Sequence, residues 1–136
     1  MKKLMTSFLA LAILAFVSCK KNKDDDVPTP AGIAGTYTLY EVEQYNPPST
    51  HALPNDEGEH GKLIVTVSGE TAAKVQLLLY KNDQKEADET FDCKIGKDAD
   101  GDIFLTTVDD NKNAAYFFDN EVDFYAVPGF RLGGRK

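Results

Sequence analysis

The sequence lacks tryptophan altogether and has only two cysteines, two histidines and two methionines among its 136 residues. It also lacks a basic excess, since 22 Asp and Glu outnumber 15 Lys and Arg and give a formal net charge of −7. This balance excludes a nucleic-acid binder, which needs a basic face. The length excludes a large multidomain enzyme, and 42% hydrophobic residues indicate one globular domain.

The motifs of common enzymes are missing as well. The sequence has no G-x-S-x-G elbow, no glycine-rich phosphate loop, no H-E-x-x-H and no C-x-x-C. Two pairs of carboxylates, Glu41 with Glu43 and Glu121 with Asp123, share a strand face, but acid pairs alone identify no reaction. We interpret them as the outside of a small barrel, and we expect no catalytic residue, no cofactor and no enzymatic activity.

No apolar run is long enough to span a bilayer. Residues 8–17 are the apolar stretch at the N-terminus, and as a helix they would cover about 15 Å, half of a hydrocarbon core. Because Lys2 and Lys3 precede this run and small residues follow it, residues 1–18 are predicted to be a signal peptide. Phe16, Val17, Ser18 and Cys19 resemble the lipobox of bacterial lipoproteins, although Phe16 replaces the usual leucine. The resemblance implies acylation of Cys19, whereas the alternative is an ordinary signal with a chance cysteine.

Residues 19–32 are predicted to be a tether, because they hold charges and two prolines and almost no apolar side chain. Their acidic run, residues 24–26, resembles signals that send some lipoproteins to the outer cell surface, and a solvated linker explains the same residues. We therefore expect a lipid anchor in the outer membrane, on the periplasmic face or at the cell surface. Without residues 1–18 the chain keeps 13 basic and 22 acidic side chains, a net charge of −9 that anionic lipid headgroups would repel.

Residues 33–136 read as an all-β domain of short strands separated by turns. Segment 74–81 also fits a helix, but its neighbours favour a strand. Seven or eight strands at this spacing predict an antiparallel up-and-down barrel, because closure removes unprotected edges. The predicted strands are 36–44, 62–68, 74–81, 90–95, 103–108, 114–118 and 122–127, with 130–132 as an eighth.

Cys93 has no partner within the chain if Cys19 carries lipid. It shares a strand face with Phe91 and Ile95, so we predict a buried, inert thiol. A reactive or intermolecular thiol is the alternative.

The start of the domain resembles the lipocalin-like, calycin-type domains of bacterial lipoproteins. Gly35-Thr36-Tyr37 stands where that family has Gly-x-Trp, and the long segment 46–61 follows. The resemblance implies that Arg131 stacks on Tyr37, that segment 46–61 covers the barrel mouth, and that a small apolar or amphipathic ligand binds inside. The candidate lining residues are Tyr37, Phe91, Phe104 and Phe124.

Two alternatives remain open at this point. A filled barrel would leave the loops and the acidic face to contact a basic protein partner, with an encounter rate that falls as salt concentration rises.

The two candidate metal sites do not match known templates. His51 and His60 are nine residues apart in segment 46–61, and residues 98–102 place Gly101 in the wrong register for a calcium loop. We expect no metal, and a hairpin tip at residues 98–102.

Overall fold

The computed structural model describes residues 29–136, so the predicted signal peptide, Cys19 and most of the tether lie outside the described residues. One short helix, α1 (Pro30–Ile33), precedes nine strands that form a single antiparallel sheet. The strands are β1 (Gly35–Tyr45), β2 (Pro48–Ala52), β3 (Glu59–Ser68), β4 (Ala72–Lys81), β5 (Gln84–Lys97), β6 (Ile103–Thr107), β7 (Asn113–Phe118), β8 (Glu121–Phe124) and β9 (Phe130–Arg135).

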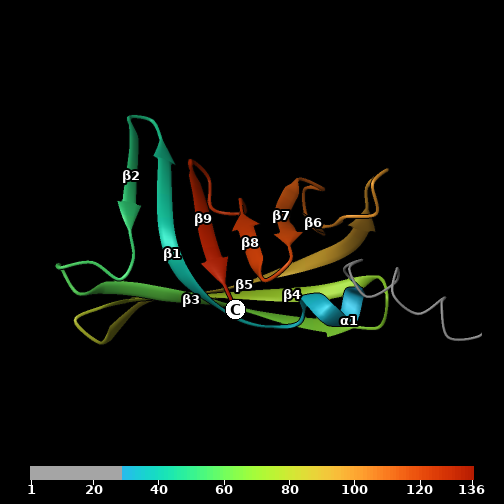
Figure 1. Cartoon of the computed structure of the whole chain (residues 1–136), viewed down its shortest axis with the longest axis horizontal. Helices are drawn as coiled ribbons and strands as arrows, with labels where there is room; N and C mark the ends of the chain where they lie inside the picture. Colours follow the sequence, from blue (N-terminus) through green and yellow to red (C-terminus); the bar gives the residue numbers. More distant parts are fainter. Residues whose placement is uncertain (1–28) are drawn as a thin grey trace, which may run out of the picture.

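The sheet closes on itself, because β1 pairs with both β3 and β9. The result is an eight-stranded up-and-down barrel with β2 as one additional strand, which confirms the predicted fold class. Figure 1 shows β3, β4 and β5 lying across the view, with β6 to β9 standing against them and the β1–β2 hairpin rising beside them.

Alternation of apolar and polar residues places the core inside. On β3 and β4, Leu63, Val65, Val75 and Leu77 are buried, and the residues between them face outward. Turns with positive φ join successive strands: Asn82 and Asp83 connect β4 to β5, and Asp119 stands in the predicted β7–β8 turn. Each predicted strand therefore overlaps an observed one, and segment 130–132 does pair, within β9.

Strand β2 is the element that sequence analysis missed. Residues 48–52 lie inside the segment predicted to be a loop, yet they pair with residues 41–45 of β1. Pro48 masks the pattern, although a proline is tolerated at the first residue of an edge strand. Only residues 53–58 remain as a loop before β3.

Helix α1 closes one end of the barrel. Thr29 caps it by accepting a hydrogen bond from the N–H of Gly32, and Ile33 is buried. Residues 30–32, which were expected to belong to the tether, are therefore part of the folded domain. The C-terminal Lys136 reaches back to the same place, where its Nζ donates to the carbonyl of Gly32 at 2.6 Å.

Candidate ligand site at the open corner of the barrel

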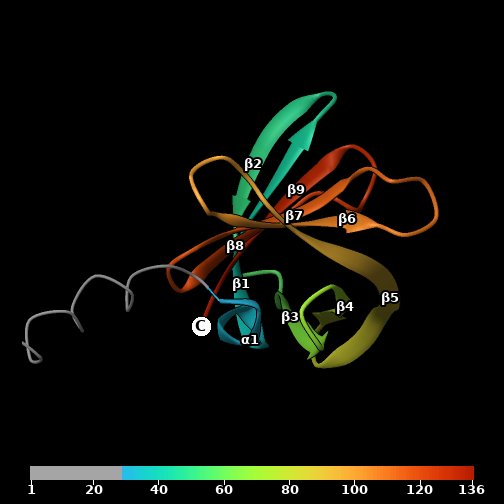
Figure 2. The same cartoon turned by 90° about the vertical axis from the view of Figure 1, so that its right-hand side faces the viewer.

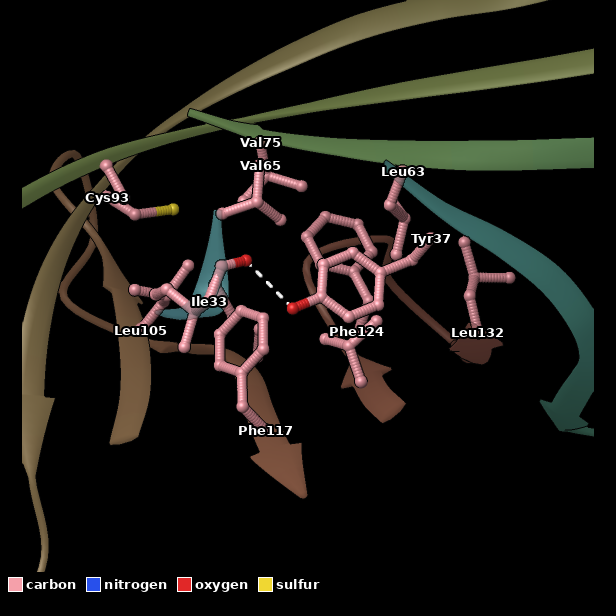
Figure 3. Close-up of a cluster of buried hydrophobic side chains, with 14 of the residues drawn as sticks. Ile33, Tyr37, Leu63, Val65, Val75, Cys93, Leu105, Phe117, Phe124 and Leu132 are labelled. Atoms are coloured by element: carbon pink, nitrogen blue, oxygen red, sulfur yellow. Dashed lines mark hydrogen bonds between the residues drawn. The ribbon is translucent and has the colours of Figure 1, made fainter. Parts of the chain in front are cut away.

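The interior of the barrel is packed with side chains. Tyr37 and Phe124, two of the four predicted ligand-lining residues, are 1% and 0% exposed and belong to one continuous core. Figure 3 shows both rings among Leu63, Phe117 and Leu132, with the Tyr37 hydroxyl donating to the carbonyl of Ile33 at 2.8 Å. Burial raises the pKa of Tyr37 to about 12. These two rings therefore fill the core instead of lining a cup.

The other two predicted ring positions lie elsewhere. Phe91 is half-buried and packs edge-on against Phe124, with ring centroids 5.2 Å apart. Phe104 faces outward from β6, covers Gly96 and lies 5.9 Å from the ring of Tyr116. Adjacent residues of a strand point to opposite faces, so Phe104 points away from the core while its neighbours Ile103 and Leu105 are buried. The structure does not bring the four rings together around a cavity.

The cation over the Tyr37 ring is Lys136, not Arg131. The Nζ of Lys136 lies 5.1 Å from the ring centroid. Arg131 pairs with Glu43 in the β9–β1 register, six residues along β1 from Tyr37 and on the outer face of the barrel. The prediction that Arg131 stacks on Tyr37 is therefore wrong, because the β9–β1 register places Arg131 opposite Glu43.

Arg131 instead binds three of the four carboxylates that the sequence places in pairs on strand faces. Its guanidinium donates to Glu43 at 2.8 Å, to Asp123 at 2.7 Å and to Glu41. The hydrogen bond to Glu43, followed by those to Asp123 and Glu41, raises the pKa of Arg131. Glu121 bonds to Arg135 at 2.8 Å in the same way. These acids tie β1, β8 and β9 together on the outside of the barrel.

A cavity of about 200 Å³ lies where the β1–β2 hairpin meets the ends of β3, β4 and β5, at the open end of the barrel. We call it the corner pocket. Its floor is apolar and half-buried, formed by Val42, Leu53 and Leu79, which pack against the core. Val42 pairs with buried Leu132, and Leu79 shares the strand face of buried Val75 and Leu77, so both face the inside of the barrel at its open end. Its remaining lining is polar or aromatic and comes from four strands: His51, Glu59, His60, Tyr80 and Glu86.

Contacts within the site hold several of these side chains in place. The rings of His60 and Tyr80 stack with centroids 5.0 Å apart and planes 8° from parallel. Glu59 accepts a hydrogen bond from Asn55 at 2.7 Å and lies 3.6 Å from Lys81. The bond from Asn55, with a contribution from Lys81, lowers the pKa of Glu59, so this carboxylate is charged at neutral pH.

The backbone at the corner also requires small residues. Gly61, on β3, is buried, and a Cβ there would come within 2.8 Å of Leu39, the carbonyl of Leu78 and Leu79. Gly58 has φ of +77°, and a Cβ there would meet the side-chain oxygen of Asn82. These two glycines allow the loop 53–58 and the start of β3 to lie close to β4.

A larger and more polar depression of about 750 Å³ adjoins the corner pocket and shares His51 and Glu59 with it. The loop 53–58 supplies Asp56 and Glu57 to its lining. Segment 46–61, the expected lid, thus contributes one strand and one acidic loop to the rim of a pocket at the open end of the barrel. The sequence singled out the two histidines as metal candidates, and alternation along segment 74–81 placed Leu79 on the face of Val75 and Leu77, but nothing in the sequence brought Leu79 together with Val42 and Leu53.

The remaining candidate residues have structural explanations. Asp98 accepts hydrogen bonds from the N–H groups of Asp100 and Asp102, both at 2.9 Å, so residues 98–102 form the predicted hairpin tip. Within residues 29–136, no cluster of three or more His, Cys, Asp or Glu is arranged to hold a metal ion. Cys93 is a free thiol that is 2% exposed, as predicted, and burial raises its pKa to about 11.

The fold and the site define a small closed antiparallel β-barrel with a filled core and a ligand-sized pocket at its open end. Searches with the chain found no matching family model, no matching curated protein and no matching solved structure. None of the helices in the described part of the chain has the length and apolar character needed to cross a membrane.

Proposed function

We propose that this protein is a non-enzymatic binding protein of the bacterial envelope that holds a small amphipathic ligand in the corner pocket. The observation that carries the proposal is the pocket's composition, an apolar floor beneath two histidines and two carboxylates. Small-molecule sites combine a mostly apolar lining with a few polar groups that fix orientation. The filled barrel supports a site outside the core.

The size and charge of the pocket favour a particular class of ligand. A dry cavity of about 150 Å³ accommodates one benzene ring, so about 200 Å³ suits a single ring with a short substituent. Glu59 is charged, and Glu86 takes part in no ion pair among the described residues. A cationic amine on the ring would find carboxylate acceptors at the rim while the ring contacts Val42, Leu53 and Leu79.

The amine preference is tested with benzylamine and its neutral counterpart, benzyl alcohol, by amide shift changes in ¹H–¹⁵N spectra. We expect saturable shifts at residues 42, 51, 53, 59–60, 79–80 and 86 with benzylamine, and weaker binding of benzyl alcohol. Glu86→Gln should weaken benzylamine binding up to about fivefold, because an ion pair with an exposed carboxylate contributes up to about 1 kcal/mol. Glu70→Gln, an exposed acid in the β3–β4 turn, is the matched control. Shifts that are scattered over the acidic surface would contradict the proposal.

Native mass spectrometry of gently purified protein tests for the natural ligand. Extra mass in the range of a small molecule, removed by organic extraction, would support the proposal and identify the ligand class. If the measured mass is that of the protein alone and benzylamine does not bind, the results would favour the alternative, a protein-interaction module. The filled core and the net negative charge favour that alternative.

The anchoring part of the proposal rests on the sequence around Cys19, which lies outside the described residues. Acyl chains on Cys19 would hold the domain at the outer membrane, since two or more chains anchor a soluble domain stably. Labelling with radioactive palmitate tests this: Cys19→Ser should abolish incorporation, and Cys93→Ser should leave it unchanged because that thiol is buried. Incorporation that survives Cys19→Ser would overturn the anchor.

A further inference from the structure

Strand β5 is longer than the strand that follows it in the sheet. It pairs with β4 over residues 84–94, but with β6 only over residues 93–97. Residues 84–92 therefore have a strand partner on one side only within the described chain, and we call this stretch the free edge of β5. Figure 2 shows the olive first half of β5 curving away from β6 and β7.

Two hydrogen bonds at the end of this stretch show which backbone groups face the unpaired side. On the β6 side, the N–H of Val108 donates to the carbonyl of Asp92 at 2.9 Å. On the β4 side, the N–H of Ile95 donates to the carbonyl of Thr71 at 2.9 Å. Backbone groups of successive residues in an antiparallel strand point to alternate edges. The N–H and C=O groups of Thr90 and Asp88 therefore point away from β4, where a further strand would bond to them.

Side chains along the same stretch define what such a strand must carry. Ala87, Glu89 and Phe91 share the face of Cys93, which is the core-facing side of β5. Ala87 and Phe91 are half-buried, while Glu89 between them is exposed. Directly opposed residues on neighbouring strands contact each other, so an added strand fits best with apolar, basic and apolar side chains at alternate positions.

Charge favours a basic partner over a second copy of this chain. Residues 84–92 contain four acidic side chains and one lysine. Asp88 and Asp92 are paired with Lys85 and Lys74, but Glu86 and Glu89 enter no ion pair among the described residues. In a two-fold pairing centred on Thr90, Asp88 of one copy would lie opposite Asp92 of the other, and like charges directly opposed are destabilising. Charged side chains on edge strands suppress self-association in this way.

We propose that the free edge of β5 binds an extended basic segment of another protein as an added β-strand. Backbone hydrogen bonds to Asp88 and Thr90 would supply affinity, and a Lys or Arg opposite Glu89 would supply selectivity. Val108, which is 46% exposed beside Asp92, adds an apolar contact at the end of the edge where β6 stops. The inference goes beyond the corner pocket and requires no ligand there.

The first test uses the full chain and the acetylated, amidated peptide Thr-Val-Thr-Lys-Thr-Val-Thr, compared with the same peptide carrying Glu in place of Lys. We expect the Lys peptide to bind at least about fivefold more tightly, which is the effect of one cross-strand charge pair of about 1 kcal/mol. Hydrogen exchange at the amides of Asp88 and Thr90 should slow on binding. If the Lys peptide does not bind at millimolar concentration, or if both peptides bind equally, the proposal is overturned.

Two variants distinguish strand addition from attraction to any acidic surface. Thr90→Pro removes an N–H that faces the unpaired side and leaves the β4 ladder in place, since proline is tolerated on a strand edge whose N–H faces solvent. It should abolish peptide binding, with Thr90→Val as its control. Glu89→Lys should invert the preference between the two peptides. Unchanged binding to a folded Thr90→Pro protein would overturn the proposal, and a Glu89→Lys protein that still prefers the Lys peptide would do so too.

Discussion

The two ends of the barrel are built differently. The closed end is formed by α1, Tyr37 and Lys136: the buried Tyr37 hydroxyl donates to the carbonyl of Ile33, and the Lys136 ammonium donates to the carbonyl of Gly32. The open corner, at the far ends of β3, β4 and β5, has no such closure. There the β1–β2 hairpin and the loop 53–58 stand over the corner pocket, and β5 continues beyond its pairing with β6.

Because of this difference, we assign the stability of the fold mainly to the closed end and ligand binding to the open corner. At the closed end Ile33 and Tyr37 are buried, and the side chains of Tyr37 and Lys136 bond to backbone carbonyls of α1, so these groups contribute to folding. At the open corner, half-buried apolar side chains, carboxylates and a strand edge remain accessible. Binding groups are commonly found on segments held by a rigid scaffold, and the closed end provides that scaffold here.

The largest expected effect is the loss of the Tyr37 ring at the closed end. Tyr37→Ala removes a fully buried aromatic side chain and should lower the free energy of unfolding by about 3–5 kcal/mol. Tyr80→Ala, at the open corner, removes a half-buried ring and should cost less than about 1.5 kcal/mol. Denaturant unfolding of the two variants checks the comparison, and equal losses would show that the ends do not differ in this respect.

The second prediction concerns alkaline pH. Tyr37 has a pKa of about 12 in the folded protein against 10.0 for the unperturbed group, because burial disfavours its phenolate. The unfolded chain therefore loses this proton first, and the stability that the neutral phenol provides is present below pH 10 and lost as pH rises from 10 toward 12. The loss should be on the order of 2–3 kcal/mol.

Tyr37→Phe isolates that contribution from the titrating lysines. The variant should be less stable than the natural chain at pH 7, because the carbonyl of Ile33 loses its buried donor, by about 1–2 kcal/mol. The difference should then shrink or reverse above pH 10. A parallel decline of both proteins between pH 10 and 12 would contradict the assignment to Tyr37. Tyr116→Phe, on the outer face, is the control and should change neither measurement.

Much of the fold was predictable because local chemistry and burial agree along most strands. Leu63, Val65, Val75 and Leu77 alternate with outward residues, and the turn at Asp119 carries the residue type that positive φ requires. Strand β2 was not predicted because residues 48–52 lie on an edge and, apart from the partly buried Ser49, are exposed. An edge strand held by backbone bonds to β1 needs no apolar pattern.

The candidate site was less predictable because it depends on register. Alternation shows which neighbouring residues share a strand face with Phe104 or with Phe124. It does not show which face points into the barrel, or whether the interior is filled or empty. Arg131 was paired with the wrong end of β1, since the β9–β1 register that places it opposite Glu43 is set by closure of the whole sheet. Val42 and Leu79 meet beneath His51 only after the hairpin stands against the sheet.

A third prediction tests what fixes the hairpin end of β1. Arg131→Met removes three charged hydrogen bonds and leaves Glu41, Glu43 and Asp123 close together without their cation. We expect a loss of about 1–3 kcal/mol in denaturant unfolding, because hydrogen bonds to charged groups are the stronger ones. Arg135→Met breaks the exposed pair with Glu121 and should cost less than about 1 kcal/mol. Equal losses would mean that Arg131 acts only as a surface charge.

The smallest expected change in stability belongs to His51, at the rim of the corner pocket. His51 is exposed on β2, and no hydrogen bond of its side chain occurs among the described residues. His51→Ala should therefore alter the free energy of unfolding by less than about 0.5 kcal/mol, as surface substitutions usually do. Benzylamine binding should nevertheless weaken, because His51 forms part of the lining of both cavities. Thr50→Ala, on the same strand but outside the corner pocket, is the control. If the His51→Ala protein binds benzylamine with the affinity of the natural chain, the β1–β2 hairpin is not part of the binding site. The ligand at the open corner would then be held by β3, β4 and β5 alone.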